Sequence, residues 1–304
     1  MNITITGGTG FLGGHLIRHL VRRNQFPTVI ARGVSKNAEL IRRIPNINFM
    51  PIPLTDDSKL FHAFRNCEAV AHLAGINHES GTSSFKEVHV EATARILHAA
   101  RKAGIKKILY VSYLKARPRC RSAYHESKWE AEELIAKSGM DYTILKPAMI
   151  YGPGDQMITQ IARALDTTPF FSPVSSFGII EPGLRPVAVE DVVRIMAAAL
   201  LEARLSKKTV AVLGPERLTL SQIVRRIARV KGKMSLMLPM PVLAHLLLAG
   251  MSEASGRSGF LPTKAQVRML AEGMDEVPAG CDELPEDLQP KLFLTDDLIK
   301  EALI

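Results

Sequence analysis

The sequence predicts an α/β fold, a Rossmann-type doubly wound parallel sheet with a smaller C-terminal α/β lobe. Short runs of apolar and β-branched residues alternate with longer amphipathic runs through the first half of the chain. A glycine-rich turn separates the first of these strands from the first helix. At 304 residues, the chain is long enough for one sizeable domain and a further lobe.

Each element is expected from its own run of residues. The strands are expected at Asn2–Thr6, Thr28–Ala31, Ile47–Met50, Ala69–Leu73, Lys107–Val111, Tyr142–Leu145 and Thr209–Leu213. The helices are expected at Phe11–Arg23, Asp57–Arg65, Phe85–Lys102, Ser122–Lys137, Met157–Leu165 and Asp191–Glu202. A capping box at Thr219 to Gln222 indicates one more helix, which runs through Arg229.

The first turn carries the strongest functional signal. Gly7, Gly10 and Gly13 follow a strand and open a helix, which is the context that a dinucleotide-binding turn requires. Gly7 permits the tight turn, Gly10 lets the backbone approach a diphosphate, and Gly13 lets the helix pack on the strand. The free N–H groups at the helix start favour negative oxygens. The predicted cofactor-binding turn therefore comprises Gly7, Thr9, Gly10, Phe11, Leu12 and Gly13.

The domain organisation follows from this turn. Residues 1–152 are expected to form the dinucleotide-binding domain, and residues 153–304 to complete the sheet and form a smaller lobe for substrate or partner. The net charge of +9 favours anionic ligands, but the basic residues are dispersed and aromatic residues are only 6%, so no nucleic acid is expected. The histidines lack metal-ligand spacing, so no metal is expected. With no secretory leader, a cytoplasmic location is the expectation.

The end of the second strand indicates which dinucleotide binds. NAD-binding proteins usually have an acidic residue there, whereas this chain has Arg32, followed by Lys36. The guanidinium of Arg32 can pair with a 2′-phosphate. NADP(H) is therefore the preferred cofactor, with NAD(H) as the alternative, and an ordinary surface role for Arg32 stays open.

A second motif places a phenol and an ammonium four residues apart, at Tyr124 and Lys128. This spacing puts both on one face of a helix, where the cation can stabilise an ionised phenol. Such a phenol can exchange a proton with a substrate hydroxyl or carbonyl. A packing role for Tyr124 is the alternative.

These motifs carry a family resemblance that covers nearly the whole chain. The chain resembles the extended or atypical short-chain dehydrogenases/reductases (NAD-dependent epimerase/dehydratase-like), and within them relatives of the NADPH-binding accessory subunit of respiratory complex I. The segments that match are Thr6–Gly13, His72–Gly75, His89–Thr93, Tyr124–Lys128, Leu145–Asp155 and Arg185–Val192.

The resemblance implies further site residues. It implies that Leu73, Ala74 and Gly75 line the cofactor, that Lys128 also holds the nicotinamide ribose, and that Pro147 and Ile150 flank the nicotinamide. It also implies a structural role for Asp191. We add Leu54, after the third strand, to the predicted cofactor-binding residues.

The chain departs from the family pattern at three positions. Leu114 stands where family enzymes carry a substrate-orienting Ser or Thr, Pro53 where an aspartate is frequent, and His89 where asparagine is frequent. Ser112 lies two residues before Leu114 and is taken as a lesser catalytic candidate. Two hypotheses remain: an NADP(H)-dependent oxidoreductase or epimerase-like enzyme acting on an alcohol or carbonyl, and a non-catalytic NADP(H)-binding assembly or redox-sensing protein.

The sequence predicts that the protein binds a small-molecule substrate. It also suggests a contact with a membrane surface or a protein partner. Leu236–Met251 is strongly apolar but too short to span a bilayer, so it is expected as a core-packing helix or as a contact for a membrane surface or protein partner. The helices Phe85–Lys102 and Ser122–Lys137 offer a face for a homodimer.

Overall fold

The computed structural model describes residues 1–33, 36–81, 83–166, 171–177, 181–254 and 264–303. The chain forms two compact units. The first contains residues 1–147, 192–211 and 278–289, and the second contains residues 148–191, 212–277 and 290–304. The division at residue 152 that the sequence suggests stays a prediction.

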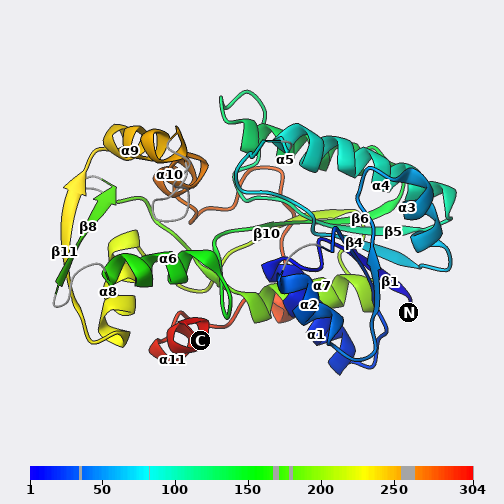
Figure 1. The fold of residues 1–304 in the computed structure, drawn as a ribbon, viewed down its shortest axis with the longest axis horizontal. Coiled ribbons are helices and arrows are strands. Elements are labelled where there is room, and N and C mark those ends of the chain that lie inside the picture. Colours follow the sequence, from blue (N-terminus) through cyan, green and yellow to red (C-terminus); the bar gives the residue numbers. More distant parts are fainter. Residues whose placement is uncertain (34–35, 82, 167–170, 178–180, 255–263, 304) are drawn as a thin grey trace. The chain divides into compact units, whose positions relative to one another are not determined.

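A seven-stranded sheet is the centre of the fold, with the strand order β10-β6-β5-β4-β1-β2-β3 (Figure 1). Every strand pair from β6 to β3 is parallel. The order reverses beside β1, so the carboxyl ends of β1 and β4 lie at a topological switch point. The strands are β1 Ile3–Thr6, β2 Thr28–Ala31, β3 Asn48–Pro51, β4 Ala69–His72, β5 Lys107–Val111, β6 Asp141–Pro147 and β10 Lys208–Val212. The predicted α/β Rossmann-type fold is confirmed.

Helices cover both faces of this sheet, α3, α4 and α5 on one face and α1, α2 and α7 on the other (Figure 1). Their bounds are α1 Phe11–Arg22, α2 Lys36–Arg42, α3 Asp57–Phe64, α4 Ala92–Lys102, α5 Ala123–Ala136 and α7 Val189–Leu201. The predicted helix Phe85–Lys102 begins with a π-helical stretch, η1 (Lys86–Glu91), before α4 continues it. Helix α2 lacked a recognisable sequence signal because it is short and largely polar.

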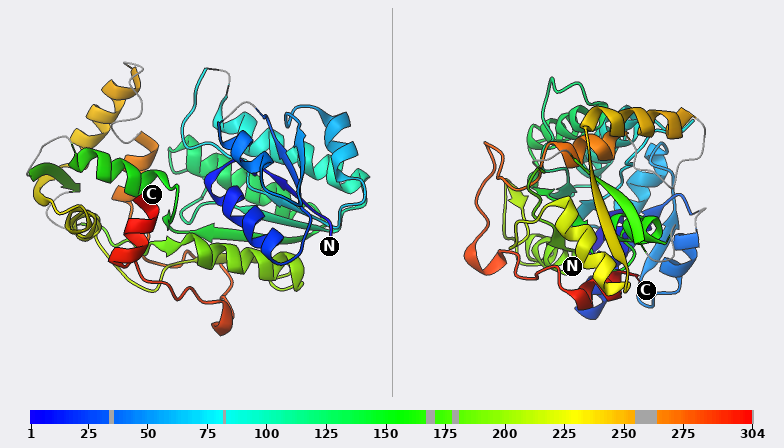
Figure 2. Two further views of the ribbon diagram at one scale, coloured as in Figure 1. Left: turned by 60° about the horizontal axis from the view of Figure 1, so that its bottom comes forward. Right: turned by 90° about the vertical axis from the view of Figure 1, so that its left-hand side faces the viewer.

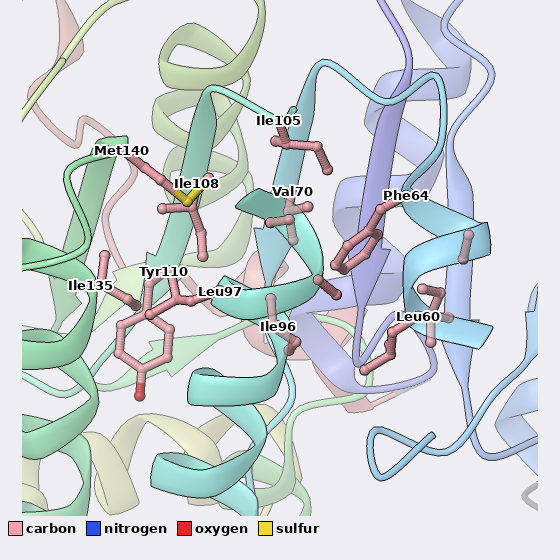
Figure 3. Close-up of a cluster of buried hydrophobic side chains, with 14 of the residues drawn as sticks. Leu60, Phe64, Val70, Ile96, Leu97, Ile105, Ile108, Tyr110, Ile135 and Met140 are labelled. Carbon is pink, nitrogen blue, oxygen red and sulfur yellow. The ribbon is translucent and has the colours of Figure 1, made fainter. Parts of the chain in front are cut away.

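The core between the sheet and the α3–α5 layer combines aliphatic side chains with the aromatic rings of Phe64 and Tyr110 (Figure 3). Ile108 and Val70 project from the sheet, and Phe64, Ile96 and Ile135 come from the three helices. All five are fully buried. The burial of these side chains fixes α5 against β5 and β6. It therefore also sets the position of the other side chains on this helix.

The second unit has its own elements, seen at two further angles in Figure 2. They are β7 Ile150–Tyr151, α6 Gln156–Leu165, β8 Phe171–Phe177, β9 Val187–Ala188, α8 Leu220–Val230, β11 Met234–Met240, α9 Val242–Ala254, α10 Lys264–Ala271 and α11 Asp296–Leu303. A one-turn 3₁₀ helix, η2 (Glu286–Leu288), belongs to the first unit. Helices α6, α8 and α11 pack on one another, as do α9 and α10. The predicted capping box is present: the Thr219 side chain accepts from Gln222, and the Gln222 side chain accepts from Thr219.

The expectation of one core-packing helix over Leu236–Met251 is wrong. The segment divides into strand β11, which pairs in parallel with β8, and helix α9. The break falls at Pro241, because proline is tolerated at a helix start but not inside a helix. Only one side of α9 is buried: Ala249 packs with Val267 of α10. Within the described residues, no helix combines the length and apolar character needed to cross a membrane.

Candidate cofactor and catalytic site

The glycine turn between β1 and α1 has the geometry that its spacing predicts. Gly7 has φ of +72°, and a Cβ placed there would lie 2.5 Å from the backbone nitrogen of Ala74. A Cβ on Gly13 would lie 2.6 Å from the carbonyl oxygen of Gly7. Neither position has room for a side chain, so the two glycines allow α1 to start directly against the ends of β1 and β4.

The start of α1 suits an anion. Gly10 is the N-cap residue with φ of −77°, no side chain caps the helix, and no acidic residue stands in its first turn. A Cβ on Gly10 would approach only the carbonyl oxygen of Gly7, at 3.2 Å. Thr9, Phe11 and Leu12 complete this turn. The N–H groups at the start of α1 therefore have neither a capping side chain nor an acidic neighbour that would oppose an anion.

The sequence predicts two cofactor-binding residues after β2, Arg32, which can pair with a 2′-phosphate, and Lys36. Arg32 follows β2 directly, is exposed, and has no partner among the described residues. Lys36 is the first residue of α2, and its side chain lies outside the described residues. The next residue, Asn37, donates to the carbonyl oxygen of Thr9 at 3.4 Å, so the start of α2 is close to the glycine turn.

The loop after β4 adjoins the same turn. The Leu73 N–H donates to the carbonyl oxygen of Thr6 at 3.0 Å, and Ala74 contacts Gly7 as described above. A Cβ on Gly75 would lie 3.2 Å from the Nζ atom of Lys128. Leu54 instead packs against the hydrophobic core. The structure thus brings Leu73, Ala74 and Gly75 to the turn and to Lys128.

Tyr124 lies near the start of α5 in a ring of aromatic side chains. Its ring makes edge contacts with Phe85, His89 and Tyr113 at centroid distances of 5.5, 5.6 and 5.6 Å. Burial raises the pKa of the Tyr124 phenol to about 12. A buried phenol with so high a pKa is neutral at pH 7, so it is a proton donor rather than a phenolate.

Lys128, one turn further along α5, has its own partners, and its expected stabilisation of an ionised Tyr124 phenol stays a prediction. Its ammonium donates to the carbonyl oxygen of Val111 at 3.2 Å and stands 5.2 Å from the centre of the Tyr110 ring. No hydrogen bond between Tyr124 and Lys128 occurs in the described part of the chain. Burial lowers the pKa of Lys128 to about 8, and the charge of Glu132 opposes this shift.

Ser112 belongs to a buried polar network. Its hydroxyl donates to the Oε1 atom of Glu132, and the Lys146 ammonium donates to Oε2 of the same carboxylate at 2.9 Å. Lys146 also donates to the carbonyl oxygen of Ala116 at 3.1 Å. Burial raises the pKa of the Glu132 carboxyl, while Lys146 and Ser112 counteract the rise. The hydroxyl of Ser112 is therefore committed to Glu132.

Two buried histidines hold the site together, and sequence reasoning missed this role. The Ile76 N–H donates to Nε2 of His89 at 3.2 Å, so the proton of the neutral ring is on Nδ1, which donates to Ser127 at 2.9 Å. The Ser127 hydroxyl in turn donates to the carbonyl oxygen of Tyr124 at 3.0 Å. Burial, followed by the charge of Lys128, lowers the pKa of His89 to about 2.

His72, the last residue of β4, has the other tautomer. Thr93 donates to the carbonyl oxygen of His89, so its hydroxyl oxygen accepts from Nε2 of His72 at 3.0 Å. Nδ1 of His72 then accepts from Thr6 at 2.8 Å. Burial lowers the pKa of His72 to about 3. The ends of β1 and β4 are thereby tied to η1 and α4.

The remaining predicted residues fall in two units. Pro147 ends β6 in the first unit and is buried, whereas Ile150 lies in β7 of the second unit and is half-buried. Asp191 is buried, and its carboxylate accepts the N–H groups of Lys291 and Leu292 at 2.8 and 2.9 Å. Asp191 thus has the structural role that the resemblance implied, since it fixes the segment before α11.

Comparison with protein families decides the assignment. The model of the NAD dependent epimerase/dehydratase family matches residues 3–214. The chain belongs to this family. The match includes the glycine turn, the loop after β4, and the Tyr124–Lys128 segment. Family membership makes it an NAD-binding, oxidoreductase-like protein with a Rossmann fold.

Relatives within the family are diverse. The chain is 28% identical to the ceramide reductase of Caulobacter vibrioides over 79% of this chain and 73% of that protein. It is 25% identical to the mitochondrial NADH dehydrogenase [ubiquinone] 1 alpha subcomplex subunit 9 of Mus musculus, over 88% and 71%. The match to the 40 kDa subunit of the Neurospora crassa NADH-ubiquinone oxidoreductase is 22% identical over 74% of this chain, and it spans 59% of that subunit.

Solved structures support the fold. The UDP-glucose 4-epimerase of Thermotoga maritima superposes with a TM-score of 0.73 and 19% identity, over 100% of this chain and 97% of that chain. A UDP-glucuronic acid 4-epimerase variant of Bacillus cereus, in complex with NAD, superposes with a TM-score of 0.75 and 16% identity, over 100% and 98%.

Proposed function

We propose that this family member binds NADP(H) at the turn from Gly7 to Gly13 and reduces a carbonyl group of a small-molecule substrate. Support for the binding site comes from the uncapped start of α1 and from the space above Gly10. Support for NADP(H) over NAD(H) comes from Arg32, which is exposed after β2 without a described partner. Lys128 and the loop from Leu73 to Gly75 would hold the nicotinamide ribose.

The buried Tyr124 phenol, one helical turn before the Lys128 ammonium, is the observation that carries this proposal. When bound, NADPH supplies a hydride to the carbonyl carbon. Tyr124 donates its proton to the carbonyl oxygen, which yields the alcohol. A pKa of about 12 keeps that proton on the phenol throughout the physiological range. The positive charge of Lys128, in the next turn of the helix, stabilises the phenolate that remains after the transfer.

The decisive experiment is Tyr124→Phe, measured as NADPH oxidation with a panel of aldehydes, ketones and quinones. The variant should lose at least about 100-fold in kcat while keeping its NADPH affinity, since only the proton donor is removed. Tyr142→Phe, on a half-buried β6 tyrosine, is the matched control and should retain activity. Equal turnover of Tyr124→Phe and the parent protein would exclude the proposed proton donor.

A second candidate function is non-catalytic binding of NADP(H) within a protein assembly or at a membrane surface. Two observations favour it. Leu114, fully buried, replaces the hydroxyl residue of family enzymes, and α9 exposes Leu243, Leu247 and Met251 at 69%, 63% and 70%, spaced four residues apart on one face. A tightly held NADPH that no carbonyl or quinone oxidises would favour this candidate over the reductase.

A further inference from the structure

Glu132 stands two turns beyond Tyr124 on α5 and is not part of the motif that the sequence singles out. Tyr124, Lys128 and Glu132 are spaced four residues apart, so they share one face of the helix. Their side chains are all buried, at 8%, 7% and 8% exposure. The helix therefore presents a phenol, an ammonium and a carboxylate in consecutive turns.

Two hydrogen-bond donors fix the Glu132 carboxylate in this position. Oε1 accepts from Ser112 and Oε2 accepts from Lys146, so both oxygens are occupied by donors from β6 and from the residue after β5. The same backbone segment fixes Lys128, because the carbonyl oxygen of Val111, the residue before Ser112, accepts from its ammonium. One short stretch of chain thus holds both the cation and the anion.

Apart from Lys146 on β6, whose ammonium pairs with the Glu132 carboxylate, the groups around Lys128 from the other elements carry no charge at neutral pH. His72 on β4 and His89 on η1 have pKa values of about 3 and 2. Burial raises the pKa values of Tyr110 on β5 and Tyr124 on α5, so both phenols are protonated. Among the described residues, Glu132 is the charged group whose sign favours the ammonium.

We propose that Glu132 is a positioning residue that keeps Lys128 in its ammonium form, and that Ser112 and Lys146 hold the carboxylate where it does so. Burial alone disfavours the charged lysine, and a fixed negative charge one helical turn away compensates for part of that penalty. Without it, a larger share of Lys128 is a neutral amine at pH 7 to 8. A neutral amine would not stabilise the phenolate of Tyr124 after proton transfer, a step that rests on the proposed function.

The direct test is the titration of Lys128 itself, without cofactor or substrate. The ¹³Cε resonance of Lys128 can be assigned with Lys128→Arg and followed by NMR from pH 6 to 10. In Glu132→Gln the midpoint should fall by about 1 pH unit. Glu132→Asp should restore most of the shift. Glu133→Gln, at the half-buried neighbouring residue that pairs with Lys137, should leave the midpoint unchanged.

The outcomes separate this proposal from a purely structural role. A loss of stability in Glu132→Gln with an unchanged Lys128 midpoint would overturn it. If Glu132→Gln does not fold, the titration of Glu132 in the parent protein tests the proposal instead. The Glu132 carboxyl must be ionised at pH 7, and its ¹³Cδ resonance must respond to the titration of Lys128. A protonated Glu132 at pH 7 would overturn the proposal. Absence of any NADPH turnover would count against the reductase alone, because these readouts do not depend on it.

Discussion

The Nδ1 atom of His89 and the hydroxyl of Ser127 lie 2.9 Å apart, and this hydrogen bond joins η1 to the middle of α5. Through Nε2, the same imidazole accepts the N–H of Ile76 in the loop after β4. One neutral ring thus connects the loop that borders the glycine turn with the helix that carries Tyr124 and Lys128.

Replacement of His89 by Phe should therefore destabilise the protein. It leaves the Ile76 N–H without its buried acceptor, at a cost of about 1–3 kcal/mol, and it removes the donor to Ser127, whose hydroxyl keeps its hydrogen bond to the carbonyl oxygen of Tyr124. Urea unfolding, followed by the fluorescence of the single tryptophan, Trp129 on α5, measures the change. His98→Phe, on an exposed position of α4, should change the free energy of unfolding by less than about 0.5 kcal/mol. Equal stability of the two variants would show that the hydrogen bonds of His89 do not stabilise the fold.

The two buried histidines also predict how stability depends on pH. Their folded pKa values, about 3 for His72 and about 2 for His89, lie below the ordinary value of 6.5. Only the unfolded chain takes up these protons, so the stabilisation is complete above pH 6.5 and is lost as the pH falls below it. Between pH 7 and pH 5 each imidazole should cost about 2 kcal/mol.

The variant His89→Asn isolates one of these contributions. It should lose about 2 kcal/mol less stability than the parent protein between pH 7 and pH 5, because one titrating group is gone. Carboxyl groups with shifted pKa values, such as Asp155 and Glu132, are common to both proteins and cancel in the comparison. Urea unfolding at the two pH values gives the difference. Parallel losses in the two proteins would show that His89 takes up a proton in the folded state.

The sequence predicted the elements of the sheet because their signals are local. The strand Lys107–Val111 is an apolar, β-branched run, and the structure has a strand with the same bounds. The break at Pro241 was harder to place, because a strand that carries a proline, as β11 does at Pro239, differs little from a helix in an apolar stretch. Pairing with β8, 63 positions earlier in the chain, selects the strand.

The candidate site likewise contains local features that the sequence predicts and long-range contacts that it does not. The glycine turn and the Tyr124–Lys128 spacing are visible in the sequence because each lies within one turn or one helix. The partners of Lys128 are not, because the carbonyl oxygen of Val111 lies 17 residues away and competes for the same ammonium. The sequence identified His89 only as a departure from the family pattern, because its contacts with Ile76 and Ser127 form only when the chain folds. Glu132 did leave a local signal, its spacing of four residues from Lys128.

The glycine turn yields a prediction that separates folding from binding. Gly10→Ala should fold, because a φ of −77° suits alanine and the new Cβ meets only one backbone oxygen. The methyl group would fill the space proposed for the diphosphate, so NADPH affinity should fall at least about tenfold, a loss of 1.4 kcal/mol. Calorimetric titration and thermal unfolding measure the two effects.

Gly7→Ala is the contrasting variant in the same turn. Its Cβ would be 2.5 Å from the backbone of Ala74 at a φ of +72°, so we expect loss of stability rather than a selective loss of binding. If Gly10→Ala binds NADPH as tightly as the parent protein, the diphosphate does not lie over the start of α1.

We expect Arg32 to determine which of the two dinucleotides binds more tightly. A guanidinium that pairs with the 2′-phosphate contributes about 1.5–3 kcal/mol, so Arg32→Ala should weaken NADPH about 10- to 100-fold and leave NADH nearly unchanged. Arg65→Ala removes the same charge from an exposed position after α3 and should affect neither cofactor. Titration of each variant with both cofactors, monitored by Trp129 fluorescence, gives four affinities. Because NADH lacks the 2′-phosphate, an equal loss for both cofactors in Arg32→Ala would mean that Arg32 acts on a part they share. Tighter binding of NADH by the parent protein would contradict the NADP(H) preference itself.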